Sequence, residues 1–208
     1  MAGLREKQKA DREKRILQAA VTKFGAHGYR SVRIEDLAEA AEVSVGTVYN
    51  YYQTKGDILI ATVAMEVEEV LASGAAIVSA PPPGVHRAIC ALIFSYYDHS
   101  LNYLSKEMWR SAMALSIEAS ATPNGRRYTD LDHRLSVQVT ELILALQARG
   151  DVRADVDATA LGEVLFNNLN QMFIEFVKDD VATLAGLRDD LARQMRPISD
   201  LIASNGQG

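Results

Sequence analysis

The chain has 208 residues, of which 48% are apolar and 24% charged, a composition typical of a soluble globular protein with one or two domains and unlike that of disordered or fibrous chains. The longest uninterrupted apolar run, residues 88–94, is too short to span a bilayer, and the lone Cys90 cannot close an intrachain disulfide. Because the N-terminus is charged and lacks the apolar stretch of a signal peptide, we expect an intracellular, cytoplasmic protein without a membrane partner.

Charge is distributed unevenly along the chain. Residues 1–55 carry ten Lys and Arg against seven Asp and Glu, whereas residues 56–208 carry 12 basic and 20 acidic side chains. A polyanion is therefore attracted to the N-terminal end and repelled by the remainder. Much of the excess lies in a basic N-terminal arm that contains Arg5, Lys7, Lys9, Arg12, Lys14 and Arg15. This arm is either a solvated segment or one that follows a groove of nucleic acid.

Apolar periodicity predicts helices almost throughout and no strand, so the expected fold class is all-α. The expected helices cover about residues 11–27, 34–41, 45–51, 55–73, 85–104, 106–119, 128–149, 159–177 and 183–204. The three prolines at 81–83 interrupt the chain, residues 122–125 read as a loop, and Pro197 is expected to kink or split the last helix.

Local signals fix several of these boundaries. Gly28 stands where a helix usually ends in a left-handed residue. Ser44 is a good N-cap because its hydroxyl can accept from a free backbone amide of the first turn. The stretch from Thr54 to Asp57 reads as a capping box that starts the fourth helix.

The second and third expected helices have the spacing of a helix-turn-helix, whose second helix can enter the major groove of DNA. The residues where the two helices must pack are small or apolar: Leu37, Ala38, Val43 and Val48. The outward residues of the third helix concentrate hydroxyl and amide groups: Thr47, Tyr49, Asn50 and Tyr51. Gly46 allows close approach of the backbone to a partner.

The stretch from Gly28 to Leu59 resembles the DNA-binding domain of TetR-type transcriptional regulators. The resemblance is carried by Asp36-Leu37-Ala38, Val43-Ser44, Gly46-Thr47-Val48-Tyr49, Tyr51-Tyr52 and Lys55. It implies a three-helix helix-turn-helix domain over residues 1–55, followed by a helical effector-binding and dimerisation domain over residues 56–208. The segment from Gly150 to Asp157 also resembles the connector that precedes the two dimer-forming helices of these proteins.

The resemblance assigns roles to individual residues. It implies DNA contacts by Arg33, Ser44, Val45, Gly46, Thr47, Tyr49, Asn50, Tyr51 and Lys55, with Tyr49, Tyr51 and Lys55 directed at phosphates. Tyr52 matches an aromatic core position. Arg33 and Glu42 depart from the family's usual threonine cap and turn glycine. A left-handed backbone at Glu42 would cost roughly 1–2 kcal/mol.

The second half of the chain offers candidate residues for an effector pocket and a dimer interface. Aromatic and amide side chains that could line an effector pocket are Phe94, Tyr97, Trp109, Met113, Asn167, Asn170 and Gln171. In the alternative interpretation, the amides hydrogen-bond one another across a dimer interface and the aromatic residues belong to the hydrophobic core. An apolar stripe on the last helix faces either a partner helix or the core; it consists of Leu184, Leu187, Leu191, Met195, Ile198 and Ile202.

No motif points to catalysis. The four histidines are scattered, and the sequence has no phosphate-binding glycine loop, nucleophile elbow or zinc pattern, so we expect no catalytic residue, metal site or cofactor. The sequence thus predicts a homodimeric repressor that binds a two-fold-related DNA operator and is released by a small-molecule effector. The alternatives are a DNA-binding protein without an effector and a helical enzyme or ligand carrier.

Overall fold

The structure of the chain is a computed structural model that describes residues 2–204. Within this range the regular elements are helices: α1 (Ala2–His27), α2 (Ile34–Ala40), α3 (Val45–Tyr49), α4 (Lys55–Ser79), α5 (Val85–His99), α6 (Lys106–Glu118), α7 (Pro123–Ala148), α8 (Ala158–Lys178) and α9 (Leu184–Ile202). One isolated antiparallel bridge pairs Val152 with Ala203. The predicted all-α class is confirmed.

The chain forms two compact units. The N-terminal unit contains the described residues up to 66 together with residues 102–129, and the C-terminal unit contains residues 67–101 and 130–204. Helices α4 and α7 each contribute to both units. The N-terminal unit is therefore discontinuous in sequence, because α6 and the first turns of α7 pack with the helices that precede residue 66.

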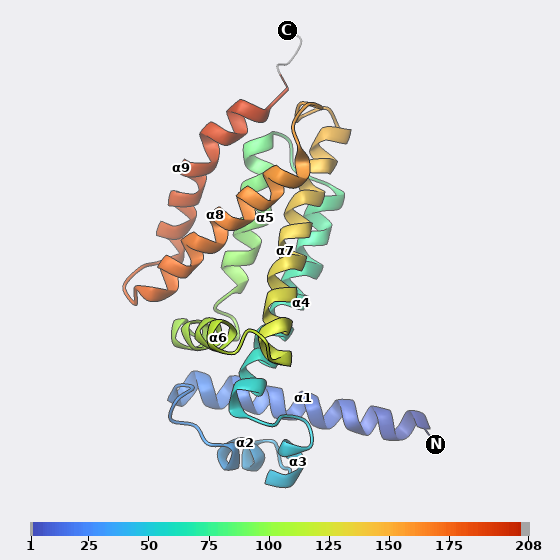
Figure 1. The fold of residues 1–208 in the computed structure, drawn as a ribbon, viewed down its shortest axis with the longest axis vertical. Helices are drawn as coiled ribbons and strands as arrows, with labels where there is room; N and C mark the ends of the chain where they lie inside the picture. The colour runs from blue at the N-terminus through green and yellow to red at the C-terminus, as the bar shows by residue number, and fades with distance from the viewer. Residues whose placement is uncertain (1, 205–208) are drawn as a thin grey trace. The chain divides into compact units, whose positions relative to one another are not determined.

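The N-terminal unit is built on α1, which runs across α2 and α3 (Figure 1). Ile16, Ala20 and Phe24 of α1 are completely buried, as are Leu37 of α2 and Val48 of α3. These side chains share one apolar core, whose burial from water is the main force that holds the three short segments together.

The C-terminal unit packs α9 against α5 and α8. Four residues of the apolar stripe on α9, namely Leu187, Leu191, Met195 and Ile202, are buried within the protomer. The stripe therefore belongs to the core of this unit. A buried hydrogen bond of 2.8 Å from the Tyr97 hydroxyl to the carbonyl oxygen of Leu169 ties α5 to α8.

Local signals predicted several boundaries well. Gly28 is left-handed, with φ of 80°. Ser44 caps α3 by accepting from the amide of Thr47 at 3.0 Å. Thr54 and Asp57 exchange the two hydrogen bonds of a capping box at the start of α4.

Other boundaries were predicted wrongly. Helix α1 begins at Ala2 rather than near residue 11, and oppositely charged residues spaced four apart, such as Lys7 and Asp11, support such a polar helix. Residues 123–125, expected as loop, are the first turn of α7. Proline is favoured at a first helical position, because the amide it lacks would have no partner there. Helix α9 runs through Pro197 to Ile202, so this proline does not split the helix.

Candidate nucleic-acid interface

The turn between α2 and α3 is tight and fully hydrogen-bonded. The amide of Ala41 donates to the Leu37 carbonyl at 2.9 Å, and the amide of Val43 donates to the Ala38 carbonyl at 3.0 Å. Glu42, between them, adopts a left-handed backbone with φ of 53°. The strain predicted for this residue is therefore present. The turn holds α2 and α3 in a helix-turn-helix arrangement.

The second helix of this motif presents a polar surface. Tyr49 is 51% exposed, Gly46 and Asn50 are exposed, and Val45 and Thr47 are half-buried. The hydroxyl groups of Ser44 and Thr47 lie 2.8 Å apart in a hydrogen bond, which fixes both side chains at the start of α3. A fixed cluster of small polar groups beside an exposed aromatic ring suits the edges and sugar-phosphate rim of a groove.

Arg33 precedes α2 and remains available for a partner. Its amide donates to the Asp36 carboxylate at 2.7 Å, so Asp36 satisfies this amide, but the Arg33 side chain does not cap the first turn of α2 as a threonine hydroxyl would. The guanidinium lies 3.9 Å from the same carboxylate and its side chain is 74% exposed. An ion pair this long and exposed contributes little to stability.

Two consecutive tyrosines join α3 to α1. The Tyr51 hydroxyl donates to the carbonyl oxygen of Lys9 at 3.1 Å. Tyr52 is buried, as predicted, and its hydroxyl donates to the Glu13 carboxylate at 3.3 Å. Burial, together with the Glu13 charge, raises the pKa of Tyr52 above its usual value. The first helix is thus tied to the segment that follows α3.

Lys55 is held by the loop between α1 and α2. Its ammonium donates to the carbonyl oxygens of Tyr29, Arg30 and Val32 at 2.8, 3.0 and 2.9 Å. It also lies 4.6 Å from the centroid of the Tyr29 ring. A lysine has three N–H donors, so these carbonyls use all of them. Desolvation lowers the pKa of Lys55, and the nearby Glu107 carboxylate opposes that shift.

Helix α6 is attached to the same loop and to the start of α4. The Glu107 carboxylate accepts a 3.0 Å hydrogen bond from the amide of Tyr29. Leu115 packs so closely on Gly56 that a Cβ there would lie 3.2 Å from its Cδ1 atom. Sequence reasoning missed Glu107, and no local signal identifies it, because its partner is 78 residues away.

The predicted pocket residues are divided between the two units. Trp109 and Met113 belong to the N-terminal unit, and the others belong to the C-terminal unit. Tyr97 is buried and stacks on Phe173, with ring centroids 6.0 Å apart. Phe94 is half-buried, and the guanidinium of Arg188 lies 4.4 Å from its ring centroid.

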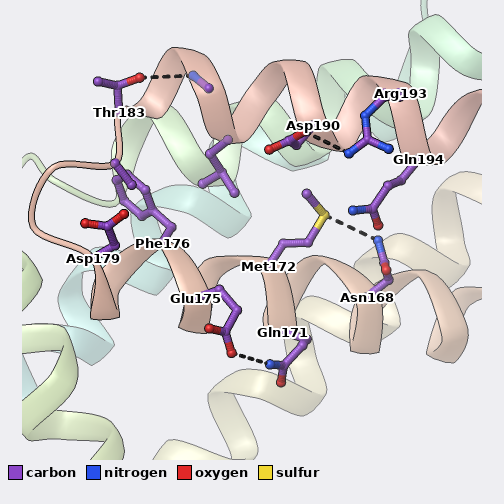
Figure 2. Close-up of a pocket in the computed structure, with 13 residues that line it drawn as sticks. Asn168, Gln171, Met172, Glu175, Phe176, Asp179, Thr183, Asp190, Arg193 and Gln194 are labelled. Atoms are coloured by element: carbon purple, nitrogen blue, oxygen red, sulfur yellow. Dashed lines mark hydrogen bonds and ion pairs between the residues drawn. The ribbon is translucent and has the colours of Figure 1, made fainter.

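The amides of α8 lie toward its surface. Asn167 and Gln171 are exposed, and Asn170 is half-buried. A surface groove runs between α8 and α9, and Figure 2 shows Asn168, Gln171 and Met172 on one wall and Arg193 and Gln194 on the other. Hydrogen bonds within each wall join Gln171 to Glu175 and Arg193 to Asp190.

Among residues 2–204, no three His, Cys, Asp or Glu side chains gather in a way that would hold a metal ion. Within the same range, no helix combines the length and the apolar character that a bilayer crossing requires.

A helix-turn-helix whose short second helix is capped and exposed is the arrangement with which many helical proteins enter the major groove of DNA. The comparisons with known proteins agree. Residues 16–62 match the family described as "Bacterial regulatory proteins, tetR family". The matched stretch contains the helix-turn-helix, so this part of the chain is similar to TetR-type regulators.

Curated relatives are matched over part of their length. The chain is 38% identical over 64 residues to the HTH-type transcriptional repressor KstR of Rhodococcus jostii, covering 31% of this chain and 30% of KstR. It is 39% identical over 54 residues to the fatty acid metabolism regulator protein of Bacillus subtilis, covering 26% and 28% of the two chains. The matches thus span less than a third of these relatives.

The fold matches solved structures over nearly the whole chain. A TetR-family transcriptional regulator from Pectobacterium atrosepticum superimposes with a TM-score of 0.73 at 17% identity, covering 95% of this chain and 97% of that one. At this identity the likeness concerns the fold, which includes the helices beyond residue 62.

Proposed function

We propose that the protein is a homodimeric transcriptional repressor of the cytoplasm that binds a two-fold-related DNA operator and releases it when a small molecule binds. The observation that carries this proposal is the exposed polar face of α3 in a rigid helix-turn-helix. The match of residues 16–62 to the tetR family, and to repressors such as KstR, supports it.

The proposed reading surface consists of Arg33, Ser44, Val45, Gly46, Thr47, Tyr49, Asn50 and Tyr51. Val45 suits the methyl group of a thymine, because it cannot hydrogen-bond a base. Thr47 and Asn50 carry the hydrogen-bonding groups suited to base edges, and Tyr49 and Tyr51 lie where the family meets phosphates. Lys55 keeps its proposed phosphate contact only if a phosphate displaces one of its three carbonyl partners.

We place the dimer interface on α8 and α9. Val164 on α8 is 56% exposed and Leu201 on α9 is 69% exposed, and exposed apolar side chains favour a partner surface. The exposed Asn167 and Gln171 then satisfy one another's hydrogen bonds across the two protomers. A dimer sets two recognition helices about 34–36 Å apart, one turn of DNA.

The effector is proposed to act on the helix that begins at Lys55, since a change in its tilt alters the separation of the two recognition helices. To move the protein from 1:99 to 99:1 between its two states, the effector must favour the releasing state by about 5.5 kcal/mol. Phe94, Tyr97, Trp109, Met113 and Asn170 remain the predicted contacts. Trp109 is the sole tryptophan, so its fluorescence reports binding near α6.

Fluorescence anisotropy with a duplex from upstream of the protein's own gene tests the proposal. We expect specific binding that a Thr47→Ala, Tyr49→Ala variant loses by tenfold or more, since each lost base or phosphate contact removes roughly 1–3 kcal/mol. Ile117→Ala is the control, because this side chain is 77% exposed on α6, away from the proposed reading surface and dimer interface. Full affinity in the double variant, or equal binding to unrelated DNA, contradicts the proposed reading surface.

A further inference from the structure

The basic N-terminal arm is a helix. Residues 5–15 are exposed along their whole length, yet they continue α1 without a break. In Figure 1 this end of α1 projects past α3 toward the N-terminus. The family match begins at residue 16, so the arm lies outside the matched stretch.

The arm carries the whole net positive charge of the DNA-binding region. Residues 2–15 hold six basic and three acidic side chains, whereas residues 16–55 hold four of each. One of those four basic residues, Lys55, already gives its three donors to backbone carbonyls. The helix-turn-helix body is therefore electrically neutral, and a neutral surface attracts a polyanion weakly.

The arm's charges are arranged by face. At 100° per residue, Arg5, Lys9 and Arg12 fall within one arc of about 60°. The three acidic residues of the arm fall outside this arc, Glu13 by about 40°, Glu6 by about 60° and Asp11 by about 100°. Arg5 and Arg12 are about 10 Å apart along the axis, a length that spans about three phosphates of one DNA strand.

This basic face points to the side of the molecule on which α3 lies. Ile16 belongs to the same arc and is completely buried in the core that α1 shares with α2 and α3. About two turns earlier on α1, the carbonyl oxygen of Lys9 accepts a hydrogen bond from the Tyr51 hydroxyl. The face of α1 that packs toward the recognition helix therefore extends beyond the core, and there it is basic.

We propose that the arm binds the phosphate backbone of the duplex beside the base pairs that α3 reads, through Arg5, Lys9 and Arg12. The inference rests on the proposed function and assigns the electrostatic attraction to DNA to the arm. Because the arm is already helical, little conformational entropy is lost on binding. Arg12 donates its Nε–H to the Gln8 carbonyl and keeps four other N–H donors for phosphate.

The test compares two pairs of substitutions with the same change in net charge. Arg5→Gln with Arg12→Gln removes two charges from the basic face, and Lys7→Gln with Lys14→Gln removes two from the opposite face. Binding to the upstream duplex and to a random 40-base-pair duplex is measured between 50 and 300 mM salt. Each lost phosphate contact reduces the slope of log K against log salt by about 0.9, so the first pair should lose about 1.8 on both duplexes and the second almost nothing.

An unchanged slope in the first pair overturns the proposal, and so does an equal loss in both pairs, since that result would reflect net charge alone. Circular dichroism at 222 nm checks that each variant keeps its helix content. If the wild-type protein binds the two duplexes equally, the proposed operator recognition fails. The slope on the random duplex still decides whether the arm binds phosphate.

Discussion

Replacement of Lys55 by methionine separates two roles for this residue. Met fills the space of the lysine stem but cannot donate to the carbonyls of Tyr29, Arg30 and Val32. A hydrogen bond to a charged group stabilises a protein by roughly 1.5–3 kcal/mol. Because Lys55 is half-buried and water can reach the loop, we expect a net loss of about 2 kcal/mol for the three bonds together. For a chain of this length that loss lowers the melting temperature by about 4–8 °C.

Differential scanning calorimetry measures the melting temperature, and hydrogen exchange reports on the amides of residues 29–32. Lys14→Met is the control, since this lysine is exposed on α1. A melting temperature within 1 °C of the wild type, with a salt slope of DNA binding reduced by about 0.9, would refute the reasoning. It would show that Lys55 serves phosphate and that the three carbonyls are satisfied without it.

Three further predictions concern stability. Glu42→Gly should stabilise the protein by roughly 0.5–1 kcal/mol in urea unfolding, because glycine adopts a left-handed backbone freely, whereas Glu42→Ala should bring no such gain. Gly162→Ala should destabilise the protein by roughly 1–3 kcal/mol, since the new Cβ would clash with the Thr140 side chain. Gly25→Ala is the control and should be neutral or stabilising, because a Cβ there meets nothing within 4 Å. Burial raises the pKa of Asp132 to about 7, above its value near 3.9 in an unfolded chain. The stability that this carboxyl contributes is therefore complete below pH 4 and is lost as the pH rises through 7, and Asp132→Asn should flatten that part of a melting-temperature profile between pH 4 and 8.

The sequence predicted those features of the fold that depend on neighbouring residues. Ser44 and the Thr54–Asp57 pair cap their helices through bonds three residues apart, and the left-handed conformation of Gly28 needs no distant partner. The same holds for the strained backbone of Glu42, whose place in the turn follows from the flanking helices. Spacing and residue type are sufficient in such cases, because the interaction is contained within one turn.

Features that depend on distant partners could not be predicted. The three carbonyls around Lys55 lie 23 to 26 residues earlier in the chain, and the partner of Glu107 lies further still. Helix α1 was predicted too short because residues 5–15 have no apolar stripe to reveal them. The candidate pocket residues were chosen by type alone. Residue type does not predict burial. Tyr97 is buried with its hydroxyl hydrogen-bonded, whereas Gln171 is exposed.

The discontinuity of the N-terminal unit bears on how this protein can be cut and recombined. A fragment that ends at residue 66 would lose Glu107 from the amide of Tyr29, Leu115 from Gly56, and the hydrogen bond between Asn124 and Asp57. A chimera that grafts these helices onto a foreign sensor at that point inherits the same loss. The transplantable module is therefore residues 2–66 together with α6 and the first two turns of α7.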